Sequence, residues 1–215
     1  MTEPMLDEDG ERTQGSDDEP GEDDAAPSRR MPTKLVALML AFAGSFGVDF
    51  ATKAWIASSL PVLGPPRPVI DGFFYLSHMR NAGTALGFFE DWPVELRRVG
   101  FSILAAIAGW VVVLFYRGLA PRDRLNGLAL GFIVGGGLGN LVDRLGRGEV
   151  IDFLHFEIMG PWSFPDFNFA DVFIMLGVAI LMIELLVSEG AARAEVIEGA
   201  SVGDDREERD TPRAE

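Results

Sequence analysis

Two aspartates stand among large apolar side chains in the stretch 149–171, EVIDFLHFEIMGPWSFPDFNFAD. Asp152 lies between Ile151 and Phe153, and Asp171 opens a long apolar run. A carboxylate in such surroundings is costly unless it is paired, hydrogen-bonded or protonated. Two carboxylates close together cannot both ionise easily, so they share a proton. One of them can then act as a base toward water while the other protonates a scissile carbonyl, which is peptide hydrolysis without a metal or a covalent intermediate.

Other hydrolytic chemistry has little support in the sequence. The chain contains no cysteine and only two histidines, which excludes disulfides, thiolate nucleophiles and cysteine-based metal sites and disfavours a zinc enzyme. A serine–histidine pair could use His78, which follows Ser77, or His155, but no serine lies in a nucleophile-elbow pattern. A serine–lysine pair would need one of the only two lysines, Lys34 and Lys53. We therefore expect neither a metal nor another cofactor.

Four apolar runs predict four transmembrane helices, at 35–60, 99–116, 125–142 and 172–188. Each is close to the roughly 20 residues that span a bilayer. The third is rich in glycine, which allows close approach of neighbouring helices. The alternative is a soluble protein with buried helices, which four near-spanning runs disfavour because they leave little polar surface for water. A cleavable signal peptide also fits poorly, since the first run contains Asp49 and Lys53.

The net charge of −15 is concentrated at the two ends of the chain. Residues 1–30 contain 11 acidic residues and 3 arginines, and residues 199–215 contain 6 and 3. The sequence predicts a disordered acidic cytoplasmic tail at 1–33, a four-span domain at 34–188 and a charged disordered cytoplasmic tail at 189–215. A nucleic-acid partner is not expected, because the chain offers no basic face to phosphates.

Polar residues of three predicted helices should meet at one face of the membrane. Asp49 and Lys53 are spaced as an i,i+4 pair toward the end of the first helix. The third helix runs in the same direction and ends with Asn140, Asp143 and Arg144, and the fourth begins there with Asn168 and Asp171. Ionisable residues at such a place are candidates for function.

Each of these groups also has a purely structural interpretation. Asp49 and Lys53 can pair and reach the interface, and Asp143 and Arg144 can form an interfacial ion pair. Asn168 can cap the fourth helix with Asp171 in its first turn. That capping account leaves Asp152 unexplained.

The basic loop 117–124, with three arginines, favours an orientation with both termini in the cytoplasm. The long segments 59–98 and 143–168 then lie on the opposite side. Alternation in FFYLSHM, at 73–79, predicts strands or a small sheet there.

Four blocks carry a resemblance to a known family: DFATK at 49–53, NAGTALG at 81–87, GGGLGNLVDRLGRGEVIDF at 135–153 and FNFAD at 167–171. In this order and at these helix ends, they resemble the bacterial lipoprotein signal peptidases (signal peptidase II), which are four-span aspartic peptidases. The resemblance implies that Asp152 and Asp171 are catalytic. It implies supporting or substrate-binding roles for seven further residues: Asp49, Lys53, Asn81, Asn140, Asp143, Arg144 and Asn168. Leu86 departs from the family, where phenylalanine is more usual, and this affects pocket shape.

The resemblance also implies the fold, substrate and location. We expect an all-α membrane protein with a small β element, in which four transmembrane helices carry an extracytoplasmic β-cradle and loop cap. The substrate would be a diacylglyceryl-modified prolipoprotein, cut just before the lipidated cysteine, in contact with membrane lipid. The enzyme would be a monomer in the bacterial cytoplasmic (inner) membrane, with its active site at the outer leaflet and inhibited by globomycin.

Two other functions remain as alternatives. A proton-coupled transporter would also place Asp and Lys within spans, but its site would lie near the midplane at a repeat interface. A non-catalytic lipoprotein-binding scaffold would keep the fold without needing both aspartates.

Overall fold

The computed structural model describes residues 31–83, 91–157 and 164–210, with side chains as far as Gly190 and at Arg193. The predicted acidic tail lies almost wholly outside these residues. So do 84–90, which include Leu86, and 158–163, over which the predicted loop cap partly falls.

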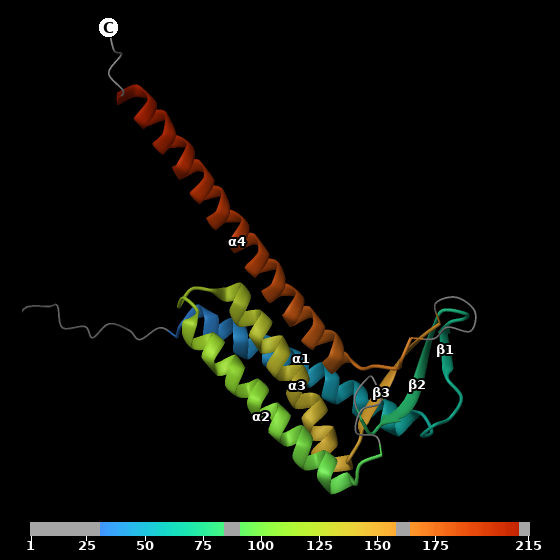
Figure 1. Cartoon of the computed structure of the whole chain (residues 1–215). Helices are drawn as coiled ribbons and strands as arrows, with labels where there is room; N and C mark the ends of the chain where they lie inside the picture. Colours follow the sequence, from blue (N-terminus) through green and yellow to red (C-terminus); the bar gives the residue numbers. More distant parts are fainter. Residues whose placement is uncertain (1–30, 84–90, 158–163, 211–215) are drawn as a thin grey trace, which may run out of the picture. The chain divides into compact units, whose positions relative to one another are not determined.

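Within the described residues the chain forms four long helices (Figure 1): α1 Thr33–Ser59, α2 Val94–Gly118, α3 Arg124–Arg147 and α4 Phe169–Asp210. Each contains a stretch long and apolar enough to cross a membrane, which in α4 is Phe169–Gly190. Many of their large apolar side chains are exposed, as expected for helices that face lipid. The prediction of four spans is confirmed.

Helix α4 continues past Ser188 to Asp210, over a stretch for which the sequence predicts a disordered tail. This stretch is rich in alanine, glutamate and arginine, which are strong helix formers. Helix propensity therefore outweighs the polar composition on which the sequence-based expectation rested.

The segments that connect α1 to α2 and α3 to α4 form a small antiparallel sheet in the order β1-β2-β3. Its strands are β1 Arg67–Ile70, β2 Phe74–Asn81 and β3 Val150–Phe156. Between β1 and β2 the chain turns through Gly72, whose φ of 74° is a conformation that glycine adopts at little cost. In β2–β3, Met79 pairs with Asp152 and Asn81 with Val150. The predicted β element is confirmed, and its pairing brings Asn81 close to Asp152.

Helices α1 and α3 pack closely through a row of glycines. Four of them recur at every fourth position of α3 and so share one face: Gly127, Gly131, Gly135 and Gly139. A Cβ atom at any of the four would collide with α1, and at Gly139 the collision would be with Oδ2 of Asp49. This small-residue face allows the backbones to approach, as the glycine-rich run predicts.

The polar ends of the helices meet on the side opposite the α2–α3 loop. Lys34, at the start of α1, donates through Nζ to the carbonyls of Tyr116 (3.0 Å) and Leu119 (2.7 Å), which places the start of α1 beside that loop. Helices α1 and α3 therefore run in the same direction. At their far ends, a buried cluster containing Ile56 and Phe153 joins α1 to β3.

Candidate active site

Asp152 lies in the middle of β3 and is only 3% exposed. Asn81 donates through Nδ2 to its Oδ2 at 2.9 Å, and Asn168 donates through Nδ2 to its Oδ1 at 2.6 Å. Burial raises the pKa of Asp152 to about 6; the hydrogen bond from Asn81 opposes the rise and the charge of Asp171 adds to it. Asp152 is thus a buried carboxyl that keeps its proton more readily than an ordinary aspartate.

Asp171 lies in the first turn of α4 and makes two kinds of contact. Its Oδ1 accepts from Nδ2 of Asn140 at 2.8 Å. Its Oδ2 accepts from the backbone N–H of Asn168 at 3.2 Å, and Oδ1 of Asn168 accepts from the Asp171 N–H at 3.1 Å. This reciprocal pattern is a capping box. The capping interpretation therefore has the right geometry, but the same Asn168 also holds Asp152, so capping does not exclude a role in the site.

Lys53 is the centre of a buried polar network. Its Nζ lies 2.8 Å from Oδ2 of Asp49 and 3.1 Å from Oδ2 of Asp143, and it donates to Oδ1 of Asn140 at 2.8 Å. The side chains of Lys53, Asp49 and Asp143 are at most 4% exposed. Oδ1 of Asp49 accepts from the Ala170 N–H at 2.8 Å. The network ties α1, α3 and α4 together, so Asp49 and Lys53 are not a pair that reaches out to the interface.

Asp143 and Arg144 make separate contacts rather than pairing with each other. Asp143 pairs with Lys53 and with Arg147, one turn further along α3. Arg144 donates to the carbonyls of Gly83 (3.1 Å) and Asn140 (3.4 Å), and its guanidinium lies 4.1 Å from the centre of the Phe101 ring. The sequence allowed an interfacial ion pair between Asp143 and Arg144, and the structure shows these separate contacts instead.

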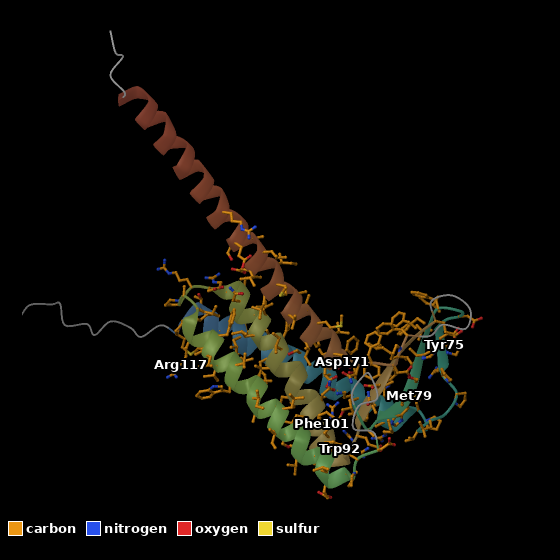
Figure 2. All side chains as sticks on the ribbon, viewed as in Figure 1. Tyr75, Met79, Trp92, Phe101, Arg117 and Asp171 are labelled. Carbon is orange, nitrogen blue, oxygen red and sulfur yellow. The ribbon has the colours of Figure 1, made fainter. Side chains whose placement is uncertain are left out.

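The two aspartates open into one cavity of about 500 Å³. Figure 2 shows Asp171 where α4 begins, beside the strands. Polar and apolar residues both line the cavity: Asn81, Asn140, Arg144, Val150, Asp152, Phe164, Pro165, Asp166, Phe167, Asp171, Val172 and Met175. Of the predicted site residues, Asn81, Asn140, Arg144, Asp152 and Asp171 therefore reach the cavity. Asp49, Lys53, Asp143 and Asn168 support them from behind.

The sequence and the fold match one protein family. The model of signal peptidase II matches residues 40–187, which is most of the chain. The chain belongs to the signal peptidase II family. It is 42% identical over 141 residues to a lipoprotein signal peptidase of Serratia proteamaculans, covering 66% of this chain and 81% of that protein. It is 39% identical over 140 residues to one of Bacillus pumilus, covering 65% and 86%.

Solved structures agree with this assignment. A bacterial membrane enzyme determined by the in meso method at 2.3 Å resolution superposes with a TM-score of 0.64 at 30% identity, covering 72% of this chain and 90% of that one. The family resemblance, the membrane fold and the protease class expected from the sequence are confirmed. The chain is a multi-pass membrane protease of the signal peptidase II family, and all nine predicted site residues fall within the matched range.

A serine protease mechanism does not fit this signal peptidase II chain. Ser77 and His155 are brought together, but Asp166 lies between them, accepting from Ser77 Oγ and lying 2.6 Å from His155 Nδ1. Nδ1 of His78 is instead bonded to the carbonyl of Leu60. In a serine triad the histidine must contact the serine to take its proton. Among the described residues, no three histidine or carboxylate side chains are grouped to hold a metal ion.

Sequence reasoning missed Arg147 and Asp166. Arg147 follows Asp143 at i+4 on a predicted helix, a spacing that signals an ion pair. Asp166 carried no comparable signal, because its partners on β2 and β3 are defined only by the folded sheet.

Proposed function

We propose that Asp152 and Asp171 are the catalytic pair of this protease and that it removes signal peptides from diacylglyceryl-modified prolipoproteins, cutting just before the lipidated cysteine. The observation that carries the proposal is the shared environment of the two carboxylates. Both line one cavity, and Asn168 contacts both. The activity named for the relatives, lipoprotein signal peptidase, supports the choice of substrate.

In this mechanism Asp152 holds the shared proton, because burial raises its pKa to about 6. Asp171, ionised, accepts a proton from a water molecule whose oxygen attacks the scissile carbonyl carbon. Asp152 donates to the carbonyl oxygen as the tetrahedral intermediate forms. Collapse of the intermediate breaks the C–N bond: the proton taken by Asp171 passes to the departing amine of the cysteine residue, and a hydroxyl proton of the intermediate returns to Asp152 as the new carboxylic acid forms. The two carboxyls titrate as a coupled pair.

The other polar residues hold this pair in place. Amide donors of Asn81 and Asn168 hold both oxygens of Asp152, and the amide of Asn140 holds Oδ1 of Asp171. The buried network around Lys53, with Asp49 and Asp143, fixes the helix ends from which these side chains project. Arg144 lines the cavity and provides a positive charge toward a bound peptide.

The location follows from the two ends of the helices. The loop at 117–124 carries three arginines. Arg117 lies in the last turn of α2, and Figure 2 shows it away from Asp171, which lies at the start of α4. By the positive-inside rule that loop and both termini are cytoplasmic, and the cavity faces the outer leaflet of the cytoplasmic (inner) membrane. A lipidated substrate must be met at this boundary. Apolar lining by Phe164, Val172 and Met175 suits such a substrate. Since one chain provides both carboxyls, a monomer suffices.

We infer that residues 34–188 form the catalytic domain and that the acidic extension at 1–33 and the tail at 189–215 are dispensable for cleavage. The family match covers 40–187 and leaves both ends out. Removal of residues 1–30 should leave turnover unchanged in detergent.

Cleavage of two matched precursors tests the proposed substrate. Purified protein in detergent is given a prolipoprotein bearing the diacylglyceryl group and the same precursor with its lipobox cysteine replaced by serine, which prevents lipidation. We expect a single cut before the cysteine of the lipidated precursor only, and inhibition by globomycin. Equal cleavage of both precursors would contradict the proposed specificity, and cleavage of neither would favour a binding scaffold.

A further inference from the structure

Three polar side chains form a cluster beside the cavity, and one of them, Asp166, also lines it. Ser77 lies on β2, His155 on β3, and Asp166 in the segment that leads into α4. Oδ2 of Asp166 accepts from Ser77 Oγ, and its Oδ1 lies 2.6 Å from Nδ1 of His155. Ser77 is 2% exposed, and the side chains of His155 and Asp166 are 17% and 15% exposed. One carboxylate thus joins two strands to the start of the last helix.

The backbone beside this cluster lies along β3. The N–H of Leu154 donates to the carbonyl of Phe167 at 2.8 Å, and the N–H of Phe167 donates to the carbonyl of Leu154 at 3.2 Å. The next residue is Asn168, which donates to Asp152 and caps α4 with Asp171. The position of Asn168 therefore depends on how the segment 166–168 is held against the sheet.

The two aspartates are carried by different elements, Asp152 by β3 and Asp171 by α4. We propose that Ser77, His155 and Asp166 form a positioning clamp that fixes Asn168 and, through it, sets Asp152 and Asp171 in the geometry that cleavage needs. The inference rests on the proposed catalytic roles of Asp152 and Asp171. The clamp residues position the pair and do not themselves react.

The clamp also controls a third carboxylate of the cavity wall. Asp166 lines the cavity that holds Asp152 and Asp171. Each of its oxygens contacts one clamp residue, Oδ2 the Ser77 hydroxyl and Oδ1 the His155 ring, which holds this carboxylate toward β2 and β3. Two further groups face His155: Oε1 of Glu157 lies 3.9 Å from its Nε2, and the ring of Tyr75 packs edge-on against it.

Removing the Ser77 hydroxyl tests the clamp without changing any charge. With one donor lost, the segment 166–168 is held less firmly and the hydrogen bond from Asn168 to Asp152 weakens. That bond opposes the rise in the pKa of Asp152, so its weakening raises this pKa further. The charged groups that act on Asp152, namely Asp171, Lys53 and Arg144, stay in place. A loosened geometry of reacting groups costs about tenfold to a hundredfold in rate.

Kinetics of Ser77→Ala and His155→Leu over a range of pH provide the test. We expect kcat to fall by about tenfold, with KM nearly unchanged. The high-pH limb of kcat/KM should move to higher pH by a few tenths of a unit, as follows from a higher pKa. His155→Asn keeps a side-chain donor near the Nδ1 position and should restore most of the rate. Ser58→Ala, which removes an exposed hydroxyl on α1, is the matched control and should match wild type.

The outcomes separate the clamp from the catalytic proposal on which it rests. In one outcome, Ser77→Ala and His155→Leu keep the wild-type kcat and the wild-type high-pH limb, while Asp152→Asn and Asp171→Asn are inactive. This result would overturn the clamp and leave the catalytic pair standing. Loss of rate with an unmoved pH limb and no rescue by His155→Asn would show a merely structural role and would also overturn it. Retained cleavage by Asp152→Asn and Asp171→Asn would overturn both proposals. If Ser77→Ala fails to fold, the comparison of His155→Asn with His155→Leu decides.

Discussion

Asn168 donates a hydrogen bond through Nδ2 to Oδ1 of Asp152 at 2.6 Å. The same side chain caps α4, because its Oδ1 accepts from the backbone N–H of Asp171. A helix cap and an active-site contact are thus made by one fully buried residue. The start of α4 cannot shift without disturbing Asp152.

Replacement of Asn168 by alanine should therefore affect stability and activity together. Loss of an N-cap costs about 1 kcal/mol. Loss of the amide donor to Asp152 should lower kcat by about a hundredfold, as for the removal of one positioned donor from an active site. Thermal unfolding and turnover in detergent measure the two effects. Asn126→Ala is the control, since Asn126 bonds Asp123 at the far end of α3; equal losses of turnover in both variants would contradict the account.

The pH dependence of kcat/KM should show a fall above about pH 6. Burial raises the pKa of Asp152 to about 6, and the pair needs one proton to act. Below this pKa Asp152 carries the proton; above it the proton is lost and the donor to the carbonyl disappears. Bound substrate excludes more water, so the corresponding limb of kcat should lie at higher pH. A kcat/KM that stays constant from pH 5 to about 9 would contradict the assignment of the proton to Asp152.

Lys53→Met should unfold or strongly destabilise the protein. It leaves Asp49 buried without its cation and Asp143 with Arg147 alone, and breaking a buried pair in this way costs about 3–5 kcal/mol. Adding Asp49→Asn and Asp143→Asn should restore part of the loss, because the two side chains that lose Lys53 as a partner are then neutral. Arg98→Met, which removes an exposed pair with Glu95, should change stability by less than about 1 kcal/mol. Equal shifts in melting temperature for both variants would refute the role of the network.

Gly139→Ala should damage the site from behind. A Cβ atom there collides with Oδ2 of Asp49, so α1 and α3 must separate or the Asp49–Lys53 pair must move. We expect a clear drop in melting temperature and in turnover. Gly137→Ala is the matched control, since nothing lies within 4 Å of a Cβ at that position on the same helix. Its stability should stay close to wild type. A benign Gly139→Ala would show that the α1–α3 contact is looser than described.

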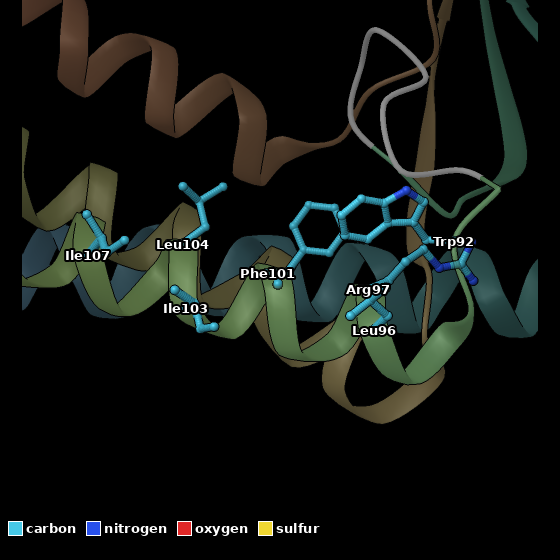
Figure 3. Close-up of a pocket in the computed structure, with 8 residues that line it drawn as sticks. Trp92, Leu96, Arg97, Phe101, Ile103, Leu104 and Ile107 are labelled. Carbon is cyan, nitrogen blue, oxygen red and sulfur yellow. The ribbon is translucent and has the colours of Figure 1, made fainter.

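Much of this architecture could be read from local sequence. Four spans follow from run length, and the meeting of Lys53, Asn140 and Asp171 at one face follows from the count of spans between them. The strand prediction at 73–79 follows from alternation. A mostly apolar hollow of about 340 Å³ lies along α2, lined by Phe101, Leu104, Arg97 and other side chains (Figure 3).

The remaining features depend on contacts between distant parts of the chain. Ser77 meets Asp166 across 89 positions, and Lys53 meets Asn140 across 87. Such pairings follow from sheet register and helix packing, which periodicity does not specify. The register shift between Leu76 and Met79 sets which β2 residues face β3, and no local pattern indicated it. Local signals therefore locate the candidate site, while long-range packing determines the partners of each side chain.

The most direct test of the catalytic pair is cleavage of a lipidated prolipoprotein by wild type, Asp152→Asn and Asp171→Asn. All three are purified in detergent and checked for wild-type melting behaviour, with Asp71→Asn on the exposed β1–β2 turn as the matched control. The account predicts that wild type and Asp71→Asn cut before the lipidated cysteine, while each of the other two, though folded, is inactive. Cleavage by folded Asp152→Asn or Asp171→Asn at the wild-type rate would contradict it and leave these carboxyls a structural role alone.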